Sequence, residues 1–165
     1  MSTAQFRGPF PLHPAALLDT ADNSINNPGT GSPSRETIHR AISTAYYALF
    51  HAINASNADI THGGPTNPTT SQAWTDTYRQ MRHNFAARHL NQHLFSFASN
   101  GRILAKSFAD LKTARETADY DPNTVLSIGD ANHWIRQSRT ALAILQAMPP
   151  TERQTLKSIT LTGHP

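Results

Sequence analysis

The chain has 165 residues, the length of a single domain that can bury a core of its own. Hydrophobic residues make up 38% and charged residues only 15%, which is typical of folded rather than disordered proteins. The net charge of +3 is too mild to identify a nucleic-acid partner by itself. The chain has no cysteine, which excludes disulfides and a thiol nucleophile, and it has neither a membrane-spanning apolar run nor a secretory pattern. We therefore expect a cytoplasmic protein with no membrane association.

Helix-breaking residues divide the chain into segments. We expect a flexible arm over residues 1–11, a single helical domain over 12–161 and a short tail over 162–165. Residues 13–22 predict a short first helix, and turn-forming residues fill 26–34. The longest cluster of breakers, Thr61 to Thr70, predicts an exposed loop.

The segment from Arg35 to Asn57 predicts the helix around which the others are organised. At about 100° per residue, its apolar side chains share one face, with Tyr46 and Phe50 at the edge. That face holds Ile38, Ile42, Ala45, Leu49, Ala52 and Ile53. The opposite face carries Arg40, Tyr47 and His51. Tyr46, Tyr47 and His51 could stack on bases or hydrogen-bond to them, or the tyrosine pair could pack in the core and at a dimer seam.

Three further helices and a short last one are expected. Residues 71–89 predict the third helix, 102–120 the fourth and 123–148 the fifth, with Gly101 separating the fourth from the stretch before it. Pro149 and Pro150 end the fifth helix before a short last one. No useful run alternates as a strand does. The fold class is therefore all-α, an up-down bundle of four to five main helices with short peripheral helices.

Arg79 and His83 lie four residues apart, a spacing that places them on one face of the expected third helix. The imidazole could act as acid or base and the guanidinium could bind a phosphate or a developing oxyanion. A solvated helix face is the more common meaning of such a spacing. His89 and His93 could supply two metal ligands, but no third lies near in sequence, so we expect no metal and no cofactor.

Arg115 lies within the apolar arc of the expected fourth helix, where an arginine is costly unless a partner satisfies it. It could form an internal salt bridge to Asp119 that fixes the helix end. Alternatively, Arg115 and Tyr120 could face a groove that takes a phosphodiester. The sequence leaves both possibilities open. It has no glycine-rich phosphate loop, GxSxG elbow or HExxH motif, which excludes those enzyme classes.

Three of these segments together resemble the HEPN superfamily, named for higher eukaryotes and prokaryotes nucleotide-binding. They are RAISTAYYALFHAI at Arg40 to Ile53, YRQMRH at Tyr78 to His83 and ARETADYDP at Ala114 to Pro122. They look like blocks of the small bacterial members and follow the same order. The last helices, with ALAILQAMPPTERQTL, match the general pattern, so the resemblance covers roughly residues 12 to 160.

The resemblance implies an all-α bundle that often pairs as a homodimer, with a groove at the dimer seam. Many HEPN proteins are metal-independent ribonucleases of toxin or defence systems that use an R-x4-6-H motif. Here Arg115 is followed by Asp119 and Tyr120, with no histidine in reach. Members without the motif are RNA-binding or nucleotide-binding modules, or partners of a nucleotidyltransferase antitoxin.

The first hypothesis is an RNA-directed, metal-independent endoribonuclease. Its expected catalytic residues are His83 as acid or base, Arg79 and Arg115 holding the phosphate and Tyr120 orienting it. Its expected RNA or nucleotide contacts are Arg40, Tyr47, His51 and Asp119. The second hypothesis is a non-catalytic module that binds a nucleotide, RNA or a partner protein. The third is a structural helical dimer whose arginines are internal ties.

Overall fold

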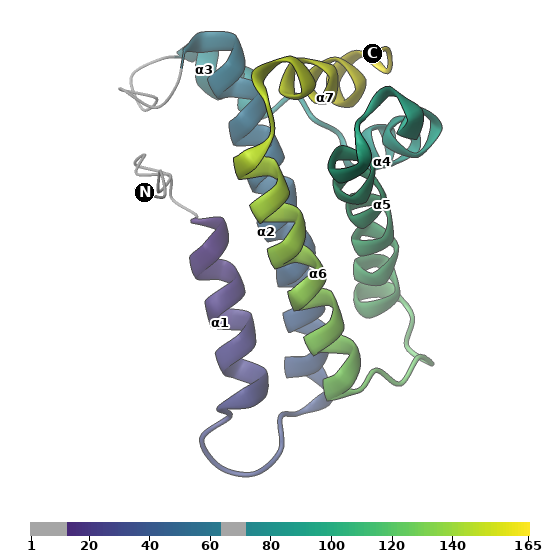
Figure 1. Cartoon of the computed structure of the whole chain (residues 1–165). Coiled ribbons are helices and arrows are strands. Elements are labelled where there is room, and N and C mark those ends of the chain that lie inside the picture. The colour runs from purple at the N-terminus through teal and green to yellow at the C-terminus, as the bar shows by residue number, and fades with distance from the viewer. Residues whose placement is uncertain (1–12, 64–71) are drawn as a thin grey trace.

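The computed structural model describes residues 13–63 and 72–165, and every regular element in these ranges is a helix. Four helices stand side by side with alternating direction in Figure 1. They are α1 (Pro14–Asn26), α2 (Arg35–His62), α5 (Ser99–Tyr120) and α6 (Ile128–Ala147). The other elements gather at the end of the bundle where α2 finishes: α3 (Gln72–Tyr78), α4 (His83–Gln92), the 3-10 turn η1 (Leu94–Ser96) and α7 (Pro150–Thr162). The all-α prediction is confirmed for the described residues.

Two of the segments predicted from the sequence lie largely outside the residues that the structure describes. The expected arm over residues 1–11 lies outside the described ranges, as does the expected loop from residue 64 onward. Thr61 and His62, placed in that loop by the sequence, still belong to α2. Within residues 13–63 and 72–165, no helix is long and apolar enough to cross a membrane.

The central helix of the bundle is α2, which packs against α1, α3, α5, α6 and α7. Its core face is the predicted one, and Ile42, Leu49 and Ile53 are fully buried. Tyr46, expected at the edge of that face, is fully buried too. The helix also continues past Asn57, its expected end, and runs on to His62. The Asn57 side chain is buried and donates a 3.0 Å hydrogen bond to Thr160 of α7, so this polar stretch packs inside the protein.

The expected third helix over residues 71–89 is wrong, because the chain forms two helices, α3 and α4, with residues 79–82 between them. The last turn of α3 tightens as the Gln80 N–H reaches the Thr77 carbonyl at 3.1 Å. Met81 then enters the core with 4% of its surface exposed, and Arg82 adopts extended geometry ahead of α4. Neither glycine nor proline marks this break.

Gly101 does not separate α5 from the preceding stretch as expected, because it lies in the first turn of α5. A Cβ atom at this position would come within 2.4 Å of Glu152 Oε1 and 2.9 Å of Phe97 Cβ. The Glu152 carboxylate also accepts the Ala98 N–H at 2.8 Å. This glycine therefore serves the close approach of α5 and α7 rather than a helix end.

The fifth predicted helix was expected from residue 123, but α6 begins only at Ile128. Asp121 accepts hydrogen bonds from the Asn123 N–H and the Thr124 hydroxyl, which hold the connection in a turn. The helix then begins with a capping box, in which Ser127 accepts the Asp130 N–H and the Asp130 carboxylate accepts the Ser127 N–H.

Replacing Ser127 by alanine is expected to lower the free energy of unfolding by about 0.5–2 kcal/mol, because an orphan N–H of α6 loses its acceptor. Urea denaturation measures the change. Ser99→Ala is the matched control, since Ser99 is an exposed first-turn serine whose hydroxyl makes no hydrogen bond to the described residues. Equal effects of the two substitutions would contradict the assignment of the cap.

Candidate functional site

A row of polar side chains joins α2 to α5, turn by turn. His39 Nδ1 donates to the Ala118 carbonyl at 2.6 Å, and the Ser43 hydroxyl donates to the Asp119 carboxylate. One turn further along α2, the Tyr47 hydroxyl accepts a 2.8 Å hydrogen bond from α5. Residues four apart on a helix share a face, so this row is the polar side of α2 turned toward α5.

Arg115 is the donor to Tyr47 and lies at the centre of this row. Its Nε atom is 2.7 Å from Oδ2 of Asp119, an ion pair in which the N–H is not aligned as a hydrogen bond. Its guanidinium carbon lies 5.5 Å from the Tyr47 ring centre and 5.1 Å from that of Tyr120. The Arg115 side chain keeps 19% of its surface exposed. The structure thus contains the internal salt bridge between Arg115 and Asp119, and it also leaves part of the Arg115 side chain exposed to solvent.

Arg115 keeps its positive charge at neutral pH. Burial acts to lower its pKa, but the hydrogen bond to Tyr47 and the carboxylate of Asp119 outweigh burial, so the pKa is raised. Nη1 has no hydrogen-bond partner among the described residues. A cation with one unpaired end is the element of this row that can meet an anionic ligand.

A hollow of about 590 Å3 opens beside Arg115, between the start of α2 and the end of α5. Tyr120 stands at its rim with 69% of its surface exposed. Other residues on its walls include Arg35, Glu36, Arg40, Asp119 and Asp121. A volume of this size is in the range of small-ligand sites, although this hollow is open to solvent rather than enclosed.

His83, the first residue of α4, reaches the same row from the other side. Its ring stacks on Phe50, with centroids 4.0 Å apart and planes 19° apart, and its Nδ1 shares a hydrogen bond with the Tyr46 hydroxyl. The Tyr47 and His83 rings meet edge-on, with their centroids 6.1 Å apart. Tyr47 therefore contacts both His83 and Arg115, and we call these three residues the Arg115–Tyr47–His83 row.

Burial, followed by the positive charge of Arg115, lowers the pKa of His83. The imidazole is therefore neutral at pH 7 and able to accept a proton. Burial raises the pKa of Tyr46, so its hydroxyl stays protonated and can donate to or accept from Nδ1. When Tyr46 accepts, the second ring nitrogen, Nε2, carries the free lone pair, and it has no hydrogen-bond partner among the described residues.

His51 supports this row from one turn further along α2. Its Nδ1 shares a 2.6 Å hydrogen bond with the Tyr78 hydroxyl of α3, and its ring lies nearly parallel to the Tyr78 ring. Burial lowers the pKa of His51, which favours its neutral form. The contact ties α3 to α2 beside Tyr47.

The structure does not bring Arg79 into the row. Because the predicted helix is broken, Arg79 lies in the link before α4, and the expectation that it shares a helix face with His83 is wrong. It is exposed, and its side chain makes no hydrogen bond or ion pair with the described residues. Arg40 is exposed as well, but it borders the hollow beside Tyr120.

Sequence reasoning missed several residues that build the site. The four-residue spacing of His39, Ser43 and Tyr47 was present in the sequence and could have indicated the row along α5. The pairing of Tyr46 with His83 could not be found in this way, because it depends on the break between α3 and α4.

The rings of His89 and His93 stack with centroids 6.3 Å apart. Among residues 13–63 and 72–165, no group of three or more histidine, aspartate or glutamate side chains could hold a metal ion. No family model, curated protein or solved structure matches this chain. The functional assignment therefore depends on the geometry of the row and on the chemistry of its residues.

Proposed function

We propose that the chain is an RNA-directed protein of HEPN type that binds RNA across the Arg115–Tyr47–His83 row and cleaves it without a metal ion. One observation carries this proposal: Tyr47 contacts a secure cation on α5 and an imidazole of lowered pKa on α4. Phosphate stabilisation and proton transfer are the two tasks that RNA cleavage requires of side chains.

In the proposed reaction, His83 takes the proton from a ribose 2′-hydroxyl. The 2′-oxygen then bonds to the adjacent phosphorus, and the bond from phosphorus to the 5′-oxygen of the next nucleotide breaks. The released 5′-oxygen takes a proton from water, which leaves a 2′,3′-cyclic phosphate on the upstream product. Arg115 offsets the charge that develops on the phosphate oxygens, and Tyr120, beside it, orients the nucleotide.

The proposal predicts cleavage of single-stranded RNA in EDTA, with 2′,3′-cyclic phosphate ends detected by mass spectrometry. The rate is expected to rise with pH and then level off, because only neutral His83 can accept the proton. Since the pKa of His83 is lowered from its ordinary value of 6.5, the inflection in kcat/KM should lie below pH 6.5. Cleavage that requires a divalent metal, or a rate that does not fall in acid, would contradict this mechanism.

A second candidate function is RNA or nucleotide binding without cleavage, and the ion pair between Arg115 and Asp119 favours it. That contact already offsets part of the guanidinium charge. In this case RNA is bound but stays intact, and Arg115→Ala weakens binding and reduces its salt dependence. If Arg115→Ala lowers only the melting temperature of a protein that binds no RNA, the arginine is an internal tie.

The resemblance to HEPN sequences extends the proposal to a role in a toxin or defence system, to a homodimer and to an antitoxin or nucleotidyltransferase partner. Its support is the order of the three sequence blocks, which end at Ile53, His83 and Pro122. Sedimentation velocity of the purified chain separates a dimer from a monomer, and a monomer at micromolar concentration would contradict the assembly.

A further inference from the structure

The hollow between the start of α2 and the end of α5 adjoins the Arg115–Tyr47–His83 row, and the proposed chemistry uses only Tyr120 at its rim. Asp119 and Tyr120 connect the hollow to the row, since each contacts Arg115 and each lines the hollow. A nucleotide whose phosphate meets Arg115 therefore has its base or its neighbour's base at the mouth of this space.

The walls of the hollow are fixed by hydrogen bonds before any ligand arrives. Arg35 donates to the carbonyl oxygens of Pro122 at 2.7 Å and Thr124 at 3.1 Å, which holds the connection after α5 against α2. The bond from His39 to Ala118 closes the floor between the two helices. The backbone around the hollow, held in this way, loses little conformational entropy on binding.

Two oppositely charged side chains line this hollow without pairing with each other. Glu36 and Arg40 are four residues apart on α2 and both face the space, yet no ion pair joins them. The Arg40 side chain makes no hydrogen bond or ion pair with the described residues. A hydrogen bond from the backbone and one from Ser34 lower the pKa of Glu36, so the carboxylate is ionised at neutral pH. The hollow thus offers a planar donor fork and an acceptor side by side.

We infer that this hollow is a guanine-binding subsite of the proposed RNA site, with Tyr120 as the stacking surface, Arg40 as the donor and Glu36 as the acceptor. The inference rests on the proposed function for the position of the neighbouring phosphate. Arginine binds the O6 and N7 acceptors of guanine with two parallel hydrogen bonds. The N1–H and N2 amino groups on the adjoining edge of the same base are donors that a carboxylate accepts.

The other bases match this arrangement less well. Adenine places an amino donor where guanine has O6, so its amino group would face the donors of Arg40. Cytosine offers Glu36 an amino group but lacks the purine N7, and uracil has no amino group. The exposed ring of Tyr120 can stack on any base, so the side chains of α2 are left to discriminate.

The test measures binding of fluorescein-labelled seven-nucleotide uridine RNAs in which the central residue is guanosine, inosine, adenosine, cytidine or uridine. The oligonucleotides carry fluorine in place of every 2′-hydroxyl, so the proposed cleavage cannot occur, and fluorescence anisotropy with the wild-type chain should show guanosine bound about tenfold tighter than the other three standard bases. Inosine, which lacks the N2 amino group, should fall between guanosine and adenosine.

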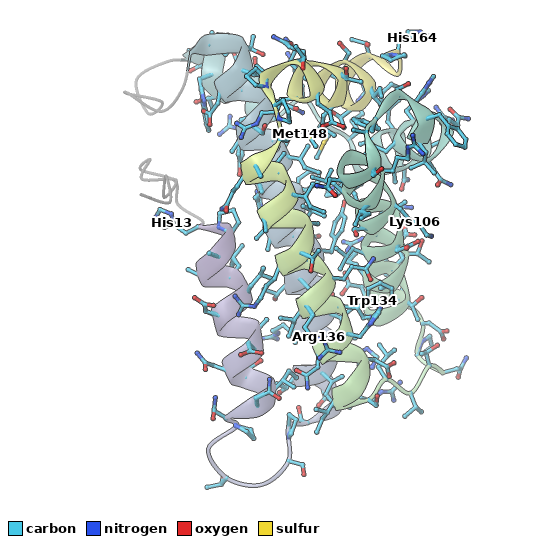
Figure 2. All side chains as sticks on the ribbon, in the orientation of Figure 1. His13, Lys106, Trp134, Arg136, Met148 and His164 are labelled. Carbon is cyan, nitrogen blue, oxygen red and sulfur yellow. The ribbon has the colours of Figure 1, made fainter. Side chains whose placement is uncertain are left out.

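Substitutions that conserve the size or the charge of a side chain distinguish hydrogen bonding to the base from a general attraction between the protein and RNA charges. Arg40→Lys keeps the charge but loses the fork, so the preference for guanosine over adenosine should fall to within about twofold. Glu36→Gln should abolish the difference between guanosine and inosine, because the N2 amino group loses its anionic acceptor. Arg136→Lys is the matched control and should change neither ratio; Arg136 is exposed on α6 and labelled in Figure 2.

A second hollow, of about 350 Å3, lies on the other side of Glu36 and Arg40, between α1 and α2. Thr20→Trp places a bulky group in it and should leave the base preference unchanged, whereas Tyr120→Leu should weaken binding of every oligonucleotide. If Thr20→Trp abolished the preference for guanosine while Tyr120→Leu left that preference unchanged, the base would lie in the second hollow and the inference would be overturned.

The outcomes distinguish failure of the subsite from failure of the proposed function. RNA binding with no base preference, or with a preference that Arg40→Lys and Glu36→Gln leave intact, overturns the subsite alone. If no RNA binds, the proposed function fails, and titration with 5′-GMP and 5′-AMP tests the hollow by itself. Amide chemical shifts at the start of α2 and the end of α5 that respond to GMP but not AMP support the subsite, and equal or absent responses overturn it.

Discussion

Replacing His83 by alanine is expected to slow RNA cleavage by about 10²–10⁴-fold, because no other group of the row can accept the 2′-hydroxyl proton. RNA affinity should change less than about threefold, since the proposed phosphate contact is made by Arg115 and the proposed role of His83 concerns the transition state. The measurement is single-turnover cleavage in EDTA, together with anisotropy on a substrate carrying a 2′-deoxy nucleotide at the cleavage position.

The control for His83→Ala is His133→Ala. His133 is an exposed histidine on α6 that packs edge-on against Trp134, and its removal should leave the rate unchanged. His83→Ala leaves the buried Tyr46 hydroxyl without its partner, at a cost of about 1–3 kcal/mol in stability, so the assays should be run well below the melting transition. Cleavage by His83→Ala at the wild-type rate would remove the imidazole from the mechanism.

Replacing Phe108 by alanine is expected to lower the free energy of unfolding by about 3–5 kcal/mol, the largest stability loss predicted here. Phe108 is fully buried on α5, and its ring centre lies 5.5 Å from that of Tyr46 on α2. The substitution therefore leaves a cavity between the two helices that carry the site. Urea denaturation with a fixed m-value measures the change.

Phe95→Ala provides the matched control for Phe108→Ala. Phe95 is 87% exposed, and its ring packs against Arg102, whose guanidinium carbon lies 5.4 Å from the ring centre. Its removal should change stability by less than about 1 kcal/mol. A loss below about 1 kcal/mol for Phe108→Ala as well would mean that α2 and α5 are not packed through these rings.

The sequence predicts α2 and the polar end of α5 well because the signals there are local. Apolar residues at helical spacing identify the core face that Ile42 and Leu49 bury. An arginine in an apolar arc indicates that a partner must exist, and both Asp119 and Tyr120 are found beside Arg115. Residues close together in the sequence were enough to predict the core face of α2 and the partners of Arg115 at the end of α5.

The break between α3 and α4 is different, because the residues around it are ordinary helix formers. Met81 is buried only in the assembled bundle, and local propensity contains no information about that contact. His83 therefore appeared to belong with Arg79, whereas it pairs with Tyr46 across the fold. The same reason applies to the hollow, whose two walls are α2 and the end of α5.

The turn-by-turn bonding of α2 to α5 bears on when the site first exists during synthesis. The bonded residues of α2 and α5 are 68, 76 and 79 positions apart in the sequence, so none of these bonds can form until α5 has left the ribosome. A nascent chain that displays only α2 offers an unpaired stripe of tyrosine and serine to its surroundings. For a protein proposed to cut RNA, this delay means that Arg115 can join the proposed site only after the chain has been made as far as α5.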